Sequence, residues 1–187
     1  MKLQQSTCEE SDTVDLWEAI RGRRSVRTFL DRPVTRETIE RLLEAAIWAP
    51  SGGNAQTWRF VVLVDPAEIR KIKIVSPGLL GDPAAVIAVC QDLVQARAKG
   101  GNLGETFLAP VDSAMATQNL LLAAYAEGLG TCAIASFHRR GVSRLLGLAE
   151  GIEPILLVSL GYPAQLPPAP ARQQEGVFVF GATRGSS

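Results

Sequence analysis

Two stretches of the chain carry a strong helical period of apolar positions. In residues 35–50 the apolar side chains recur at i, i+3, i+4 and i+7, at Ile39, Leu42, Leu43 and Ala46. Thr35 can cap the start of this helix, and Pro50 ends it. Residues 111–128 predict a second helix that is apolar almost all round, so we expect it to be central or buried against another chain.

Other apolar runs have the length of strands. Residues 58–65 are rich in β-branched and aromatic side chains, and residues 154–162 form a similar run. Residues 83–90 show no alternation of apolar and polar positions, which is typical of a strand covered on both faces. Residues 131–137 predict a short strand or an extended loop.

Short helices are predicted over residues 14–21, 67–73 and 138–148. Gly22 follows the first of them, and a glycine at positive φ is a common way to end a helix. Residues 95–110 contain several glycines and no sustained period, so we expect a loop or a mobile turn there.

Helices and strands mix along the chain without an internal repeat or a linker, which predicts one α+β domain over residues 13–187. We expect residues 1–12 to be a flexible N-terminus. Residues 163–187 would form an extended C-terminal arm, because the arm begins with a proline-rich stretch. Near its end, residues 177–180 (VFVF) would be a lone strand, which needs a sheet edge in its own subunit or in a neighbour's.

Composition narrows the classes of function. The chain has 187 residues and a formal net charge of zero, so no global field attracts nucleic acid or an anionic membrane. Its three cysteines show neither a disulfide framework nor the spacing of metal ligands, which suits a reducing cytoplasm. The apolar runs are far shorter than the roughly 20 residues of a membrane-spanning helix. We therefore expect a cytoplasmic protein without a metal site and without nucleic-acid or membrane partners.

Basic residues nevertheless gather locally, where Arg23, Arg24 and Arg27 surround Ser25. Guanidinium groups bind phosphate well because they donate paired hydrogen bonds and keep their charge. In an extended loop the side chains alternate, so Arg23, Ser25 and Arg27 would point one way and Arg24 another. The alternative is a solvated basic loop that pairs with Asp31 or Glu37.

A second polar segment, APSGGNAQTW, follows the helix of residues 35–50. Gly52 lets the backbone approach a ligand closely, while Ser51 and Asn54 offer a hydroxyl and an amide to the polar edge of a flat ring. The alternative is a tight helix-to-strand connection made of common turn residues. Taken with the arginines, the segment indicates a phosphorylated aromatic cofactor, and flavin mononucleotide (FMN) fits best.

These motifs together resemble the FMN-dependent nitroreductase family. The matching pieces are RGRRSVRTF, PSGGNAQTW, TQNLLLAAYAEGLG running into GTCAIASF, and LVSLGYP, in the family's order. The resemblance implies a nitroreductase-like α+β sandwich whose central sheet is mixed, mainly antiparallel and flanked by helices. It also implies an obligate homodimer that exchanges its C-terminal strands and binds two FMN molecules at the subunit interface.

The resemblance also assigns site residues. Arg23 and Ser25 match positions that contact the phosphate and ribityl chain, with Arg24 beside them, and Arg27 matches the basic position near the flavin's N1–O2 edge. The opposite subunit would contribute a loop, with the matching residues Pro50, Ser51, Gly52 and Asn54.

A third matching segment would present its backbone to the flavin N5 atom, with the residues Cys132, Ala133, Ile134 and Ala135. Arg172 matches a late basic residue that closes over the phosphate. No side chain receives a catalytic role, because the flavin carries the chemistry. Many relatives have tryptophan where this chain has Ala133, which implies a wider and less polar pocket.

The activity that the resemblance implies is a ping-pong cycle. NADH or NADPH would reduce the FMN, and a nitroaromatic, a quinone or a similar electron-poor acceptor would then take the electrons. Alternatives on the same scaffold are flavin reduction or fragmentation and reductive dehalogenation. A flavin-binding carrier or sensor without turnover is an alternative from another class.

Overall fold

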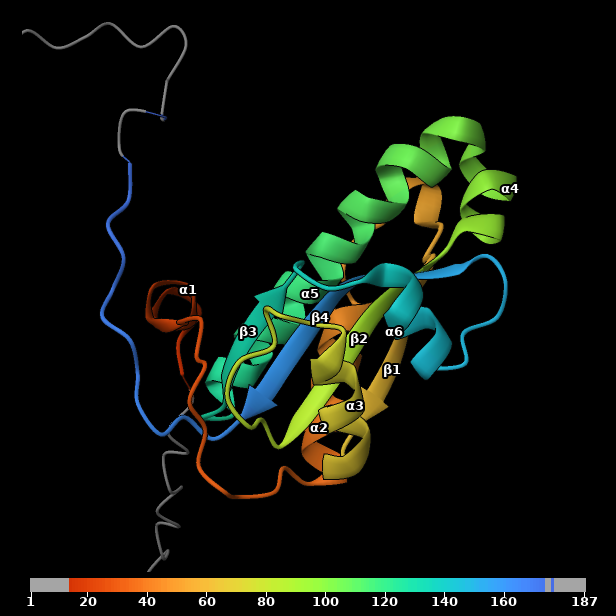
Figure 1. Ribbon diagram of the computed structural model, residues 1–187. Coiled ribbons are helices and arrows are strands. Elements are labelled where there is room, and N and C mark those ends of the chain that lie inside the picture. Colours follow the sequence, from red (N-terminus) through yellow and green to blue (C-terminus); the bar gives the residue numbers. More distant parts are fainter. Residues whose placement is uncertain (1–13, 174–175, 177–187) are drawn as a thin grey trace, which may run out of the picture.

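The computed structural model describes residues 14–173 and 176. Four antiparallel strands form its central sheet in the order β1-β2-β4-β3 (Figure 1). Their bounds are Trp58–Leu63 for β1, Ala85–Asp92 for β2, Gly130–Ile134 for β3 and Ile152–Gly161 for β4. The α+β fold and the antiparallel character of the sheet are confirmed.

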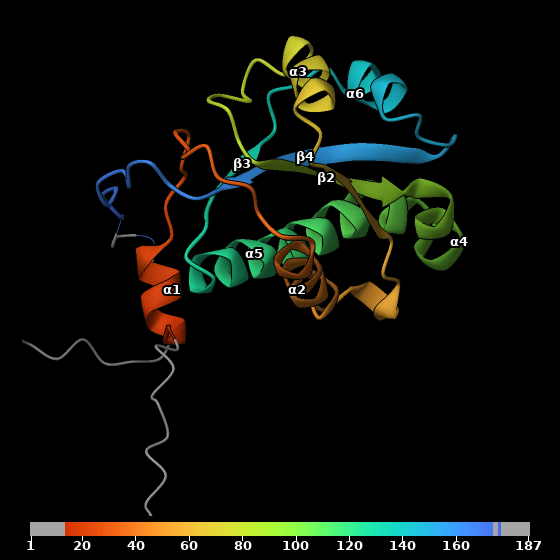
Figure 2. The same ribbon diagram turned by 90° about the horizontal axis from the view of Figure 1, so that it is seen from below.

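Helices cover both faces of the sheet (Figure 2). On one face lie α2 (Arg36–Ile47) and α5 (Ala109–Ala126), and their apolar side chains pack with Ile87, Val89 and Val158. On the other face lie α3 (Pro66–Ile74) and α6 (Arg139–Leu145), which pack with Ala88 and Leu157. The central strand β2 is therefore covered on both sides, as its unbroken apolar run predicts.

Helix starts follow the capping residues of the sequence. The side chains of Asp15, Thr35, Asp65 and His138 each accept a hydrogen bond from a backbone N–H of the first turn of α1 (Leu16–Gly22), α2, α3 and α6. His138, the only histidine of the chain, therefore has a structural role at its position. At the other end of α5, Gly128 has a φ of 71°, which suits a C-terminal cap.

The expectation of a loop over residues 95–110 is wrong. The chain forms α4 (Leu93–Leu103), a π-helical turn η2 (Gly104–Leu108) and then α5 without a break. Gly101 kinks this segment at a φ of 58°, and no side chain fits at Gly104 because its Cβ would strike the carbonyl oxygen of Ala96. The glycines that hide the helical period therefore serve the bend and the close packing of the helix.

Gly22 ends α1 as predicted, but not through a positive φ. Gly22 does not have a positive φ. A Cβ at position 22 would instead lie 2.5 Å from the ring carbon Cζ of Tyr125 on α5. This glycine is needed for helix packing.

The C-terminal arm is extended over residues 163–173. It begins beside the arginine segment, where Phe29 bridges Pro163 and the N–H of Ala164 donates to Thr28. The flexible N-terminus expected over residues 1–12 and the lone strand expected over residues 177–180 lie outside the described residues. None of the described helices combines the length and the apolar character needed to cross a membrane.

Candidate functional site: a basic cavity at the sheet edge

The arginine segment runs along the outer edge of β3. Ser25 forms a parallel bridge with Thr131, and the N–H of Val26 donates to the carbonyl oxygen of Thr131 at 2.9 Å. Val26 is fully buried against Gly130, where any Cβ would lie within 2.9 Å of its side chain. Because Val26 points inward, its neighbours Ser25 and Arg27 are directed toward the surface.

The segment lines a cavity of about 360 Å³ together with the C-terminal arm. Its lining residues are Arg23, Arg24, Ser25, Arg27, Pro167, Pro168, Pro170 and Arg172. Arg23 and Arg172, far apart in the sequence, thus meet in one basic cavity. The prolines hold the arm extended, which carries Arg172 to the mouth of this cavity.

The arginines of this cavity keep their charges free for an anion. Among the described residues, none of Arg23, Arg24, Arg27 and Arg172 forms a salt bridge with a carboxylate. The alternative of a basic loop paired with Asp31 or Glu37 is therefore wrong for the described part of the chain. Four guanidinium groups around one cavity make it a site for a phosphate or another multiply charged anion.

The side chain of Arg24 makes hydrogen bonds to the backbone that the sequence does not predict. Its Nη1 atom donates to the backbone carbonyl oxygens of Arg21, Gly22 and Arg23 at 2.6, 2.8 and 3.1 Å. These carbonyls belong to the last turn of α1, where no further turn satisfies them. Arg24 thus fixes the backbone from which Arg23 projects.

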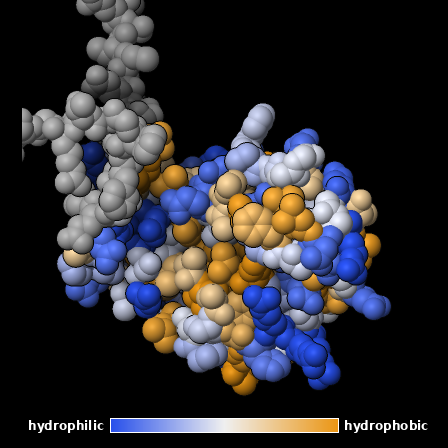
Figure 3. Space-filling view, turned by 90° about the horizontal axis from the view of Figure 1, so that it is seen from above, coloured by the Kyte–Doolittle hydropathy of each residue, from blue (hydrophilic) through white to orange (hydrophobic). Residues whose placement is uncertain are grey.

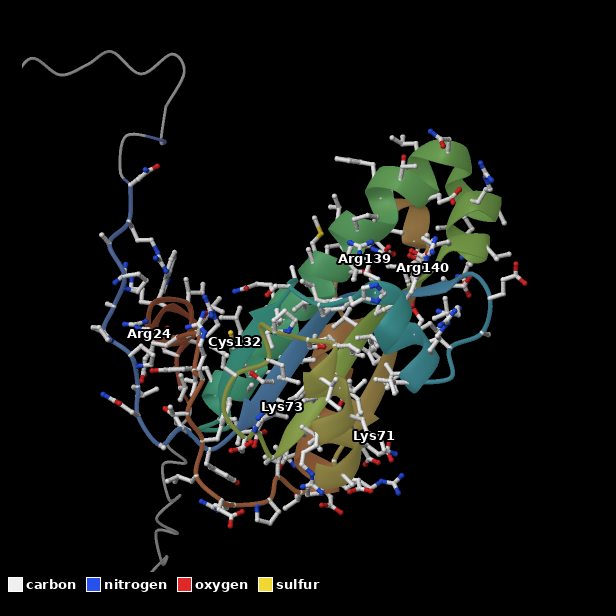
Figure 4. The ribbon with its side chains drawn as sticks, in the orientation of Figure 1. Arg24, Lys71, Lys73, Cys132, Arg139 and Arg140 are labelled. Atoms are coloured by element: carbon white, nitrogen blue, oxygen red, sulfur yellow. The ribbon has the colours of Figure 1, made fainter. Side chains whose placement is uncertain are left out.

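The segment after the bridge continues the same sheet edge. The side chains of Cys132 and Ile134 are buried in the core against α3 and α6, whereas Ala133 and Ala135 are exposed. Figure 4 shows Cys132 beside the segment that carries Arg24. The backbone of β3, rather than the Cys132 thiol, therefore borders the basic cavity.

The Pro50–Asn54 loop does not join this cavity. Its 3₁₀ turn η1 (Gly52–Asn54) lies at the end of the molecule opposite the arginine segment in both ribbon views (Figures 1 and 2). One copy of the chain therefore cannot bring the two predicted binding segments to a single small ligand.

The loop has unusual backbone dihedral angles and a dense network of hydrogen bonds. Gly53, Asn54 and Gln56 have φ values of 57°, 54° and 49°, and such a value is uncommon for a residue as long as glutamine. Gln56 donates from its backbone N–H to the Ser51 hydroxyl and from Nε2 to Asn54 Oδ1. These bonds fix Ser51 and Asn54, the two side chains expected to face a ligand.

More distant side chains hold the loop from behind, and the sequence did not single them out. Gln95 of α4 donates to the carbonyl oxygen of Ala55 at 2.7 Å, and Arg59 of β1 ties Gln95 to Asp92. Asp112 of α5 accepts from the N–H of Gly52 at 3.1 and 3.2 Å. The only available signal for Asp112 was an acidic residue within an almost wholly apolar helix.

No metal centre was found in the described part of the chain, where no cluster of three His, Cys, Asp or Glu residues could hold an ion. Burial raises the pKa of the Cys90 thiol to about 11, so Cys90 stays protonated at neutral pH. The chemistry available near the basic cavity is thus anion binding, backbone hydrogen bonding and close approach to a sheet edge.

Comparison with known proteins identifies the family of this chain. A family model described as the nitroreductase family matches residues 20–76 and 75–162. A protein of Methanothermobacter thermautotrophicus, provisionally named NADH dehydrogenase/NAD(P)H nitroreductase, is 33% identical over 82% of this chain and 80% of its own length. The chain belongs to the nitroreductase family.

Two further relatives carry more specific names. The FMN reductase (NADPH) of Bacillus subtilis is 27% identical over 80% of this chain and 66% of its own length. The NADPH:FMN oxidoreductase of Vibrio harveyi, whose structure was solved with NAD+, has a TM-score of 0.79 and 25% identity, covering 92% of this chain and 79% of that one.

Proposed function

We propose that this protein is a homodimeric, FMN-dependent oxidoreductase of the cytoplasm. It would use NADH or NADPH to reduce nitroaromatics, quinones or similar electron-poor acceptors by a ping-pong cycle. Membership of the nitroreductase family and the names of its relatives support an NAD(P)H-dependent oxidoreductase. The observation that carries the proposal is the basic cavity, whose arginines have no described carboxylate partner.

The residues of this cavity fit the cofactor. The FMN phosphate is a dianion, and Arg23, Ser25 and Arg172 can bind it from both sides of the cavity, while Arg27 is left for the flavin ring. The edge of β3 next to the cavity offers backbone at Ala133, two residues beyond the bridged Thr131 and therefore on the same outer edge. When bound, FMN supplies hydride and electron transfer between the nicotinamide and the acceptor.

A second copy of the chain would complete each site. Since the arginine segment and the Pro50–Asn54 loop lie at opposite ends of one copy, the loop would reach the cavity from the partner. There its Ser51 and Asn54 would bind the polar edge of the flavin, while Arg23 and Arg172 hold the phosphate. Positive charge from Arg27 near the ring would stabilise the reduced, anionic flavin.

Exposed apolar residues support this dimer. Figure 3 shows apolar side chains gathered over the middle of the face seen from above, with hydrophilic side chains around them. Large side chains from α2, α4, η2 and α5 remain exposed in one copy: Ile47, Trp48, Leu103, Phe107 and Met115. Burying them against a partner would stabilise the dimer by the hydrophobic effect.

The free edge of the sheet offers a place for the exchanged strand. β1 is an outer strand, and no described residue pairs with its open side. Exposed strand edges are places where another strand adds. We propose that residues 177–180 of one copy add to β1 of the other.

The proposal is tested on the purified protein. It should be yellow, release about one FMN per chain on denaturation, and oxidise NADH or NADPH when a nitroaromatic or quinone is supplied. Colourless protein that added FMN cannot reconstitute would refute the cofactor. Protein that binds FMN but turns over with no acceptor would instead favour the carrier or sensor.

A further inference from the structure

Behind the Pro50–Asn54 loop lies a second cavity, of about 220 Å³. The loop forms one wall, through Gly52 and Gly53, and α4, η2 and α5 form the others. Most of its lining residues are glycine or alanine. Leu108 packs against Gly52, but nothing lies within 4 Å of a Cβ built at Gly53, so open space backs this part of the loop.

The loop also has a backbone that would relax if it were free. Gln56 and Asn54 occupy the left-handed region, which is unfavourable for most residues other than glycine. Such conformations persist only where the surroundings hold them. Hydrogen bonds must supply this support, because the cavity removes packing from one side.

From outside the loop, Asp112 bonds to the backbone of Gly52, which lies between Ser51 and Asn54 in the chain. Only 3% of Asp112 is exposed, and its carboxylate accepts from the N–H of Gly52 through both oxygens. No described basic side chain forms a salt bridge with it. A buried carboxylate bonded to one backbone N–H stabilises that backbone position more than a neutral acceptor does.

We propose that Asp112 is a positioning residue that holds the cofactor-binding loop in its binding conformation across this cavity. It does not touch the ligand itself. It acts through Gly52, and thereby on Ser51 and Asn54 of the loop. The inference rests on the proposed function only for the identity of the ligand, FMN. The anchoring of the loop by Asp112 does not depend on that function.

The test compares Asp112→Ala, Asp112→Asn and Ser113→Ala. Ser113 is the matched control, because it is the next residue of α5, is fully buried and has a hydroxyl that bonds to none of the described residues. FMN affinity is measured by the quenching of flavin fluorescence, and the melting temperature of each FMN-free protein is recorded. Hydrogen exchange of the peptide covering residues 51–56 reports on the loop directly.

We expect Asp112→Ala to weaken FMN binding about tenfold or more, because a charged hydrogen-bond acceptor is lost. Exchange in residues 51–56 should rise in the FMN-free protein. Asp112→Asn keeps an acceptor oxygen and should restore most of both properties, while Ser113→Ala should change neither.

Three outcomes would overturn the inference. One is an Asp112→Ala protein with the FMN affinity and loop exchange of the wild type. Another is an equal loss in Ser113→Ala, which would indicate general damage to the helix. The third is a failure of Asp112→Asn to restore any loop protection. If the wild type itself binds no FMN, the proposed function fails, yet the exchange measurement still decides the role of Asp112.

Discussion

Gly22 of α1 faces the ring of Tyr125 on α5 so closely that no side chain fits between them. This contact sets the distance between α1 and α5. Because Arg23 follows Gly22 directly, the same contact determines where the arginine segment begins.

Replacing Gly22 with alanine should therefore disturb both stability and binding. Overpacking of this kind costs about 1–3 kcal/mol, and we expect a lower melting temperature together with weaker FMN retention. Thermal denaturation and FMN titration measure the two effects. Adding Tyr125→Leu should restore most of the loss, whereas Tyr125→Phe should not, because the ring carbon Cζ stays in place. A Gly22→Ala protein as stable as the wild type would contradict the packing role.

Arg23 and Arg27 should matter for the cofactor rather than for the fold. Without described carboxylate partners, neither adds an ion pair to the FMN-free protein. Replacing either with alanine should raise the FMN dissociation constant about tenfold or more, because charge-assisted hydrogen bonds are lost, to the phosphate for Arg23 and to the flavin ring for Arg27. The melting temperature of the FMN-free protein should hardly change.

Arg36→Ala is the control for these variants, since Arg36 is an exposed arginine of α2 that pairs with Glu40. It should leave FMN affinity unchanged. Equal destabilisation of the FMN-free protein by Arg23→Ala and Arg27→Ala would instead assign those arginines to the fold.

The ion pair between Arg41 and Glu127 should give a small, pH-dependent stabilisation. Arg41 donates from Nε to Oε1 of Glu127 at 2.7 Å and from Nη2 to Oε2 at 2.8 Å, and this hydrogen bonding lowers the pKa of Glu127. The stabilisation is therefore present above the ordinary pKa of glutamate and is lost as the pH falls through the lowered value. Because both side chains are exposed to solvent, we expect this stabilisation to be small at neutral pH.

Thermal denaturation of the wild type and of Arg41→Ala at pH 7 and at pH 3 measures this stabilisation. The difference between the two proteins should shrink at the lower pH and in high salt. A difference that stays constant with pH would mean that Arg41 contributes through packing alone.

Cys90 should resist alkylation in the native protein. Its burial in β2 raises its pKa to about 11, so the reactive thiolate is scarce at pH 8 and the reagent has no access. Unfolding returns the pKa to about 8.5, so the stability that this thiol contributes is lost as the pH rises above that value toward 11. Mass spectrometry after iodoacetamide treatment should find Cys90 modified only in denatured protein, and rapid native labelling would contradict this.

Sequence patterns predicted most of the elements, because most of them obey local rules. The helical period of Ile39, Leu42 and Ala46 identified α2. The unbroken apolar run of β2 identified a strand with helices on both faces of its sheet. The helical segment α4–η2 escaped prediction because its stability comes from tertiary contacts, such as the approach of Gly104 to Ala96. A period read along the chain contains no such contact.

In the candidate site, too, the sequence predicts features that depend on residue type and misses those that depend on tertiary contacts. The arginines and the Pro50–Asn54 loop carry residue types that suggest a ligand, so the sequence indicated them. Asp112 and the capping bonds of Arg24 act through backbone groups brought together by folding. Nothing in the spacing of these residues predicts those partners, since 60 positions separate Asp112 from Gly52.

The separation of the arginine segment from the Pro50–Asn54 loop has a consequence for the proposed enzyme. Each polypeptide would contribute residues to both catalytic centres of the dimer, and neither centre would be complete without the partner. Dilution to free subunits would then release the cofactor, and one damaged copy would impair both centres of the pair that it enters.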